Sequence, residues 1–169
     1  MIDLIIVLIG LILIIYASLD LVGINLLYLI KYLISSDVRR RRSEVREYIE
    51  KVLPQRLNLI YNVLLGIRAP DSITPPTTWL MFRESEKPGG KYVWGLGIIS
   101  LDVPKNEPED LIPVLDHELT HYVQDVEGLK GPRPYLEGMA TYVELRLHGK
   151  IRGYRYELRR YLKYVRNSV

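Results

Sequence analysis

Two histidines and a glutamate carry the clearest chemical signal in the sequence. His117, Glu118 and His121 form the pattern His-Glu-x-x-His inside the segment VLDHELTHYV. In a helix, residues four apart lie one turn above each other on the same face, so both imidazoles can converge on one metal ion. Glu118 is then within reach of a water molecule at that ion. The pattern predicts a zinc site with Glu118 as the general base.

A catalytic zinc ion takes three protein ligands and keeps a fourth position open, so a third ligand is needed. The third histidine, His148, lies about 16 Å along the next predicted helix from the site, which excludes it. Glu127 is poorly placed because it continues the helix of the two motif histidines. We predict Glu137 as the third ligand, on the next helix after a turn rich in glycine and proline. The small Gly138 and Ala140 are expected to let this helix approach the first one.

Two polar residues are candidates for holding a zinc-binding histidine ring through a hydrogen bond. Thr141 lies one turn beyond Glu137 on the same face. Asp125 lies one turn beyond His121, where a solvated helix end is an equally good explanation. The donor that would stabilise an oxyanion stays open among Tyr142, Tyr154 and Arg152.

The motif HELTH, followed by EGMA on a downstream helix, resembles the gluzincin zinc metallopeptidases. A short sheet, an HExxH helix and a glutamate helix are similar to the minigluzincins, soluble minimal relatives of integral-membrane peptidases of the Ste24 and HtpX type. The resemblance covers roughly residues 79–148. It implies a zincin-like fold and an edge strand, assigned to residues 93–99, that pairs with extended substrate. Many gluzincins carry an acidic residue four positions after the glutamate ligand, where this chain has Thr141.

The elements around this site begin with an apolar N-terminal segment. Residues 4–19 carry no charge, and after Asp20 the apolar character resumes up to Lys31. We predict a transmembrane anchor over residues 1–34, because such a run matches the hydrocarbon core of a bilayer, with Asp20 near an interface. Basic residues follow the segment and none precedes it. The positive-inside rule therefore predicts a single-pass membrane protein whose catalytic domain faces the cytoplasm.

Residues 35–67 repeat apolar side chains at helical spacing with arginine and glutamate between them. This predicts a basic helical stalk, kinked or restarted at Pro54. Residues 68–169 are expected to form a minimal metallopeptidase domain of the α+β class. In it, strands over residues 79–84 and 91–101 are expected to pair as a hairpin. Helices are expected over about residues 110–127, 135–148 and 152–166.

The expected function is a membrane-anchored, zinc-dependent endopeptidase that hydrolyses peptide or protein substrates. The net charge is +3, and the positive charge is concentrated in residues 39–42 and in the last twenty residues. A surface of anionic membrane lipids explains the first cluster more simply than nucleic acid does. The absence of cysteine excludes a disulfide framework, a thiolate zinc site and a peptide deformylase. Two rivals stay open: a catalytically inactive membrane-anchored metal-binding or interaction protein, and a pore-forming protein acting through residues 4–34. The oligomeric state is not predicted.

Overall fold

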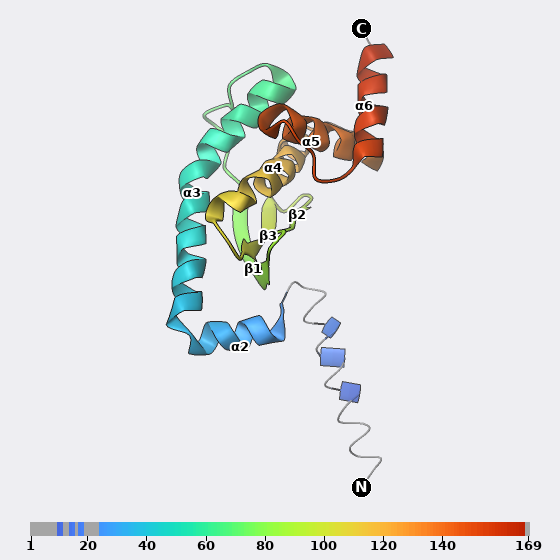
Figure 1. The fold of residues 1–169 in the computed structure, drawn as a ribbon. Coiled ribbons are helices and arrows are strands. Elements are labelled where there is room, and N and C mark those ends of the chain that lie inside the picture. Colours follow the sequence, from blue (N-terminus) through green and yellow to red (C-terminus); the bar gives the residue numbers. More distant parts are fainter. Residues whose placement is uncertain (1–9, 12–13, 16, 19–23, 168–169) are drawn as a thin grey trace.

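The computed structural model describes residues 10–11, 14–15, 17–18 and 24–167 of the 169-residue chain. The elements that surround the site are, in chain order, α2 (Leu26–Ile34), α3 (Ser36–Leu65), β1 (Thr77–Ser85), β2 (Gly90–Val93), β3 (Ile98–Pro104), the 3-10 helix η1 (Pro108–Leu111), α4 (Ile112–Val126), α5 (Arg133–His148) and α6 (Arg155–Asn167). The α+β architecture agrees with the sequence-based prediction. In Figure 1, α3 runs along one side of the molecule, and α4 and α5 lie above the strands.

The strands form one sheet in the order β1-β3-β2. β1 is parallel to β3, and β2 is antiparallel to it. The predicted hairpin between residues 79–84 and 91–101 is therefore wrong. Residues 94–97 form a turn that divides the predicted second strand into β2 and β3, and these two strands form the hairpin. Gly95 and Gly97 have φ angles of 72° and 62°, a left-handed conformation that glycine adopts without strain. The edge strand next to the site is β2. Residues 93–99 were predicted to form this edge strand, but Ile98 and Ile99 belong to the central strand β3.

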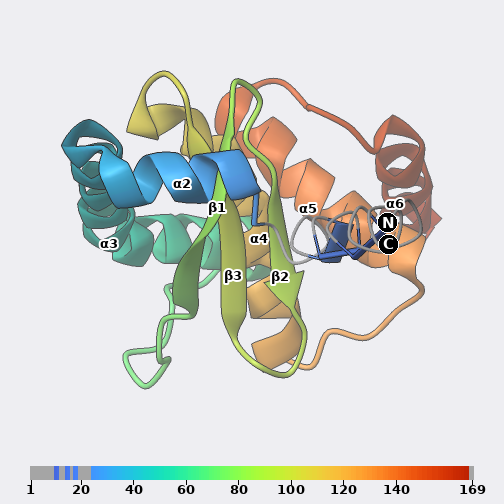
Figure 2. The same ribbon diagram turned by 90° about the horizontal axis from the view of Figure 1, so that it is seen from below.

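Helix α4 lies at the centre of the molecule. Every residue from Val114 to Gln124 is buried, which requires neighbours on all sides of the helix. These neighbours are β2 and β3 on one side, and α3 and α5 on the others. Figure 2 shows α2 across one face of the sheet and α4 behind the opposite face.

The segment predicted to be a stalk packs along the domain. It forms the single helix α3, which continues through Pro54. Val45, Ile49 and Leu57 on this helix belong to the same hydrophobic core as the sheet and α4. The helical periodicity seen in the sequence therefore reflects burial of this helix against the sheet and α4.

The prediction of an N-terminal transmembrane helix over residues 1–34, and of a single-pass membrane protein with it, is wrong for the residues that the structure describes. Among them, no helix is both long enough and apolar enough to cross a bilayer. The second apolar run forms α2, whose nine residues span about 13 Å of the roughly 30 Å needed. The Asn25 side chain caps its start, and Asn25 N–H donates to the Phe82 carbonyl of β1. Asp20 and most of residues 4–19 lie outside the described residues.

Two arginines of the basic cluster have partners inside the fold. Arg39 donates to the carbonyl oxygens of Tyr32 and Leu33 at the end of α2, at 3.1 and 2.8 Å. Arg42 is buried, donates to two carbonyl oxygens of β1, and lies over the Phe82 ring. Arg39 and Arg42, which the sequence analysis assigned to a lipid surface, thus link α3 to α2 and β1.

Candidate functional site

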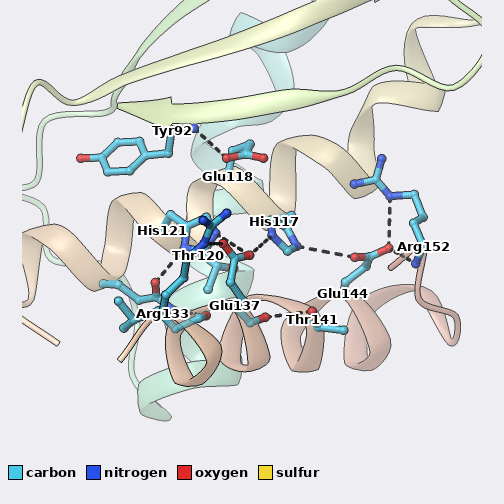
Figure 3. A network of polar contacts seen from close by, with 12 residues as sticks. Tyr92, His117, Glu118, Thr120, His121, Arg133, Glu137, Thr141, Glu144 and Arg152 are labelled. Carbon is cyan, nitrogen blue, oxygen red and sulfur yellow. Dashed lines mark hydrogen bonds and ion pairs between the residues drawn. The ribbon is translucent and has the colours of Figure 1, made fainter. Parts of the chain in front are cut away.

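Helix α4 presents His117 and His121 on one face, as the spacing of the motif predicts. Both rings are buried, and their centroids lie 5.0 Å apart with the ring planes nearly perpendicular. Glu118 is also buried and points toward β2, where its carboxylate accepts a hydrogen bond from the Tyr92 N–H at 2.7 Å. One turn of α4 therefore supplies all three motif side chains to the same region (Figure 3).

Glu137 of α5 closes the group. Its Oε2 atom lies 3.3 Å from Nε2 of His117 and 3.5 Å from Nε2 of His121. The candidate ligand atoms of the three residues all lie within 4.8 Å of one another, so the group can hold a metal ion. Two atoms bound at about 2.1 Å to a tetrahedral ion lie about 3.4 Å apart, which the contacts to Oε2 match. The two contacts to Oε2 therefore have about the spacing that ligands of a common metal ion require.

Helix α5 reaches this position through a contact from α4 that the sequence-based argument missed. The Gln124 side chain is fully buried, and its Nε2 donates to the Leu136 carbonyl oxygen at 2.9 Å. The small Gly138 has a different role from the predicted one. A Cβ atom at Gly138 would lie 2.6 Å from the Glu157 carbonyl oxygen and 2.6 Å from Cβ of Tyr161, so this glycine admits the close approach of α6.

Gln124 also fixes the His121 ring. Nδ1 of His121 lies 2.8 Å from the Gln124 Oε1 atom. An amide oxygen only accepts hydrogen bonds, so Nδ1 carries a proton, and the neutral ring then offers Nε2 to a metal ion. This is the tautomer that a metal ligand needs. Gln124 follows His121 by three residues on the same helix face, a spacing that sequence analysis could have used.

Glu144 is the corresponding partner of His117. It is buried, and its Oε2 lies 3.7 Å from Nδ1 of His117. Its Oε1 accepts hydrogen bonds from the backbone N–H and Nε of Arg152, at 2.9 and 3.1 Å. Glu144 follows Glu137 by seven residues, two turns along α5, and supplies an acidic group where Thr141 could not.

The two residues predicted to orient the histidine rings have other partners. Thr141 Oγ1 donates to the Glu137 carbonyl oxygen of its own helix at 2.8 Å. Asp125 Oδ2 accepts hydrogen bonds from Tyr92 Oη and the Gly95 N–H, both at 2.7 Å. Asp125 therefore holds the turn after β2 and does not contact a histidine through these bonds.

The charges in the group depend on one another. Hydrogen bonds to His117 and His121 hold the pKa of Glu137 well below its usual range. Burial lowers the pKa of His117, but contacts with Glu137 and Glu144 outweigh it and raise that pKa to about 9. Burial raises the pKa of Glu118 above its ordinary value, although both imidazoles oppose the shift. The two carboxylates thus have opposite tendencies: Glu137 stays ionised, whereas Glu118 is a stronger base than an exposed glutamate.

A cleft of about 650 Å³ opens beside the group. Its lining comes from β2 and the turn after it, from α4 and α5, and from the segment before α6. Tyr154 lines the cleft and stacks on His117 with centroids 5.6 Å apart. Of the other candidate oxyanion donors, Arg152 is bonded to Glu144, and Tyr142 packs against Tyr161. Only Tyr154 of the three lines this cleft.

His148 takes no part in the group, as predicted. Its Nε2 lies 2.7 Å from Oδ2 of Asp116, a fully buried carboxylate that also accepts hydrogen bonds from Arg56. Arg56, Asp116 and His148 therefore link α3, α4 and α5.

The fold and the site together define an α+β protein with a buried His/His/Glu group that can hold a metal ion. The chain matches no known family model, no curated protein and no solved structure. The resemblance to the gluzincins therefore stays a prediction that rests on the motif residues.

Proposed function

We propose that the chain is a zinc-dependent endopeptidase. One observation carries the proposal: His117, His121 and Glu137 converge within bonding range of a common ion, and the carboxylate of Glu118 lines the same cleft. Three ligands and an adjacent free carboxylate are the parts that metal-assisted hydrolysis of an amide needs.

Zinc is the metal that this donor set favours. Two imidazoles and one carboxylate form a recurrent ligand set of catalytic zinc, which leaves one coordination position for water or substrate. Ions such as magnesium and calcium prefer an all-oxygen environment. When bound, zinc supplies acidification of a water molecule and polarisation of the peptide carbonyl.

Glu118 carries the proton during the reaction. Its carboxylate takes a proton from the attacking water as the oxygen of that water forms a bond to the carbonyl carbon. The C–N bond then breaks, and Glu118 delivers the proton to the leaving amine. Burial favours this role because it raises the pKa of Glu118 and so strengthens the base. The Tyr92 N–H orients the carboxylate from the side of β2.

The position of β2 supports a peptide as substrate. β2 is the edge strand of the sheet and borders the cleft through Gly90, Lys91 and Tyr92. A strand edge binds extended peptide by adding it as a further strand, here through backbone groups of β2 other than the Tyr92 N–H, which bonds Glu118. Such pairing recognises backbone along a chain and does not require a free terminus, which favours an endopeptidase.

The test is cleavage of an unfolded protein by the zinc-loaded full chain and by the variant Glu118→Gln. The variant keeps all three proposed ligands, so we expect it to retain zinc and to lose cleavage by several orders of magnitude. Cleavage that continues at the wild-type rate in Glu118→Gln would refute the mechanism. Zinc binding without cleavage by the wild-type chain would favour the inactive metal-binding protein.

A further inference from the structure

Trp94 stands exposed beside the proposed reacting centre. It lies in the turn between β2 and β3, lines the cleft, and its ring centroid is 5.8 Å from that of His121. Of its surface, 45% is accessible to solvent. The protein thus leaves a large aromatic surface in water at the place where a bound peptide would lie.

The Trp94 ring is held in position by the residues around it. Tyr92 packs edge-on against it, with centroids 5.6 Å apart. The hydroxyl of Tyr92 and the N–H of Gly95, on either side of Trp94, donate to the same oxygen of Asp125. An aromatic surface that is fixed before binding loses little conformational entropy when a ligand covers it.

The charges in the cleft restrict which side chain can lie there. Lys91 and Arg133 line the cleft and repel a basic side chain. The carboxylate of Glu118, which is not one of the proposed metal ligands, also lines the cleft and repels an acidic one. A large apolar side chain meets neither cost and can cover the Trp94 ring.

We infer that Trp94 forms an apolar subsite, and that the preferred substrate carries a large aromatic or aliphatic side chain next to the scissile bond. This inference rests on the proposed peptidase function. Asp125 is a positioning residue for the subsite, because it holds Tyr92, which packs against Trp94, and Gly95, which follows it, and does not itself line the cleft.

The first experiment maps the cleavage sites of the zinc-loaded full chain in a denatured protein by mass spectrometry. We expect large apolar residues to be enriched beside the cleaved bonds. A peptide built on the strongest site is then compared with its alanine-substituted form. The wild-type chain should favour the apolar peptide in kcat/KM by roughly ten-fold, the lower end of what an apolar pocket achieves for a change of side-chain size.

The variant Trp94→Ala should abolish most of that preference. Trp79→Ala is the matched control, because Trp79 is 42% exposed but lies on β1 at the other edge of the sheet. Asp125→Ala should lower the preference, and Asp125→Asn should restore it, because the amide oxygen still accepts hydrogen bonds. An active enzyme with no apolar enrichment, or an unchanged preference in Trp94→Ala, would overturn the subsite and leave the proposed function standing.

A binding measurement separates the two proposals when no cleavage is found. The sequence holds two tryptophans, so Trp79→Phe leaves Trp94 as the only one. In Trp79→Phe combined with Glu118→Gln, addition of an apolar peptide to the zinc-loaded chain should shift the Trp94 emission to shorter wavelength. The alanine-substituted peptide should need roughly ten-fold higher concentration. Emission that does not respond to the apolar peptide would refute the subsite, whatever the outcome for catalysis.

Discussion

The close approach of β2 to α4 leaves no room for a side chain at Gly90, beside the proposed base Glu118. A Cβ atom there would lie 2.6 Å from Cγ1 of Val114, 2.9 Å from Cγ of Glu118 and 3.0 Å from Cδ2 of Leu101. All three neighbours are buried. Because carbon atoms pack at about 3.5–4.0 Å, the variant Gly90→Ala must separate β2 from α4 by roughly 1 Å. The Tyr92 N–H then moves away from the Glu118 carboxylate.

Two quantities should change in Gly90→Ala. Overpacking at a buried contact should lower the free energy of unfolding by about 1–3 kcal/mol, measured by urea denaturation. Displacement of the base by about 1 Å should lower kcat/KM for a peptide by about 100-fold. Zinc content should stay at the wild-type value, because the added atom does not meet the three proposed ligands.

Gly153→Ala is the control for Gly90→Ala. A Cβ at Gly153 would meet no atom within 4 Å, so stability and kcat/KM should match the wild type. Wild-type kcat/KM and stability in Gly90→Ala would show that the strand and helix have room to spare. That result would refute the argument that contact with β2 places Glu118.

Three further variants test the supports of the site. Glu144→Ala removes the carboxylate beside Nδ1 of His117 and should weaken zinc binding by about 10- to 100-fold in a chelator competition; unchanged affinity would show that Glu144 only packs. Arg56→Ala leaves the fully buried Asp116 without its guanidinium partner and should lower the free energy of unfolding by about 3–5 kcal/mol in urea; a loss under about 1 kcal/mol would contradict a coupled buried pair. Gly138→Ala would put a Cβ 2.6 Å from a backbone oxygen of α6, so α6 should be cut sooner in limited proteolysis and stability should fall by about 1–3 kcal/mol; an unchanged digestion rate would contradict this contact.

The parts of the site that could be predicted from the sequence depend on local geometry. His117 and His121 converge because a helix places residues four apart on one face, whatever the rest of the fold does. The helix predicted to bear Glu137 over residues 135–148 agrees with α5, whose start and end are set by local proline and glycine signals. Helical periodicity was enough to find both elements.

The parts that could not be predicted depend on contacts between distant segments. The parallel pairing of β1 with β3 joins strands whose register no local pattern encodes. Residues 26–34 are as apolar as part of a membrane span, yet they form a short helix that Asn25 caps and that contacts β1, with Tyr28 buried. Hydropathy alone does not separate these two outcomes.

The polar residues beside the ring nitrogens of the proposed ligands could be predicted only in part. Gln124 and Glu144 lie at helical spacings from His121 and Glu137, so their faces could have been read from the sequence. Which acidic or amide group reaches a ring nitrogen depends on how α4, α5 and the Arg152 segment pack. Thr141 lies on the predicted face of its helix, but its short side chain donates a hydrogen bond to the Glu137 carbonyl oxygen of the same helix.

Zinc content tests the central claim most directly. The purified full chain, Glu137→Ala and the exposed-site control Glu109→Ala are dialysed against zinc and then against buffer, and zinc per chain is measured by mass spectrometry. The structure predicts one zinc ion per chain in the wild type and the control, and a clear loss in Glu137→Ala. A wild-type chain that keeps no zinc, or a Glu137→Ala variant that keeps as much as the wild type, would contradict the assignment of the metal group.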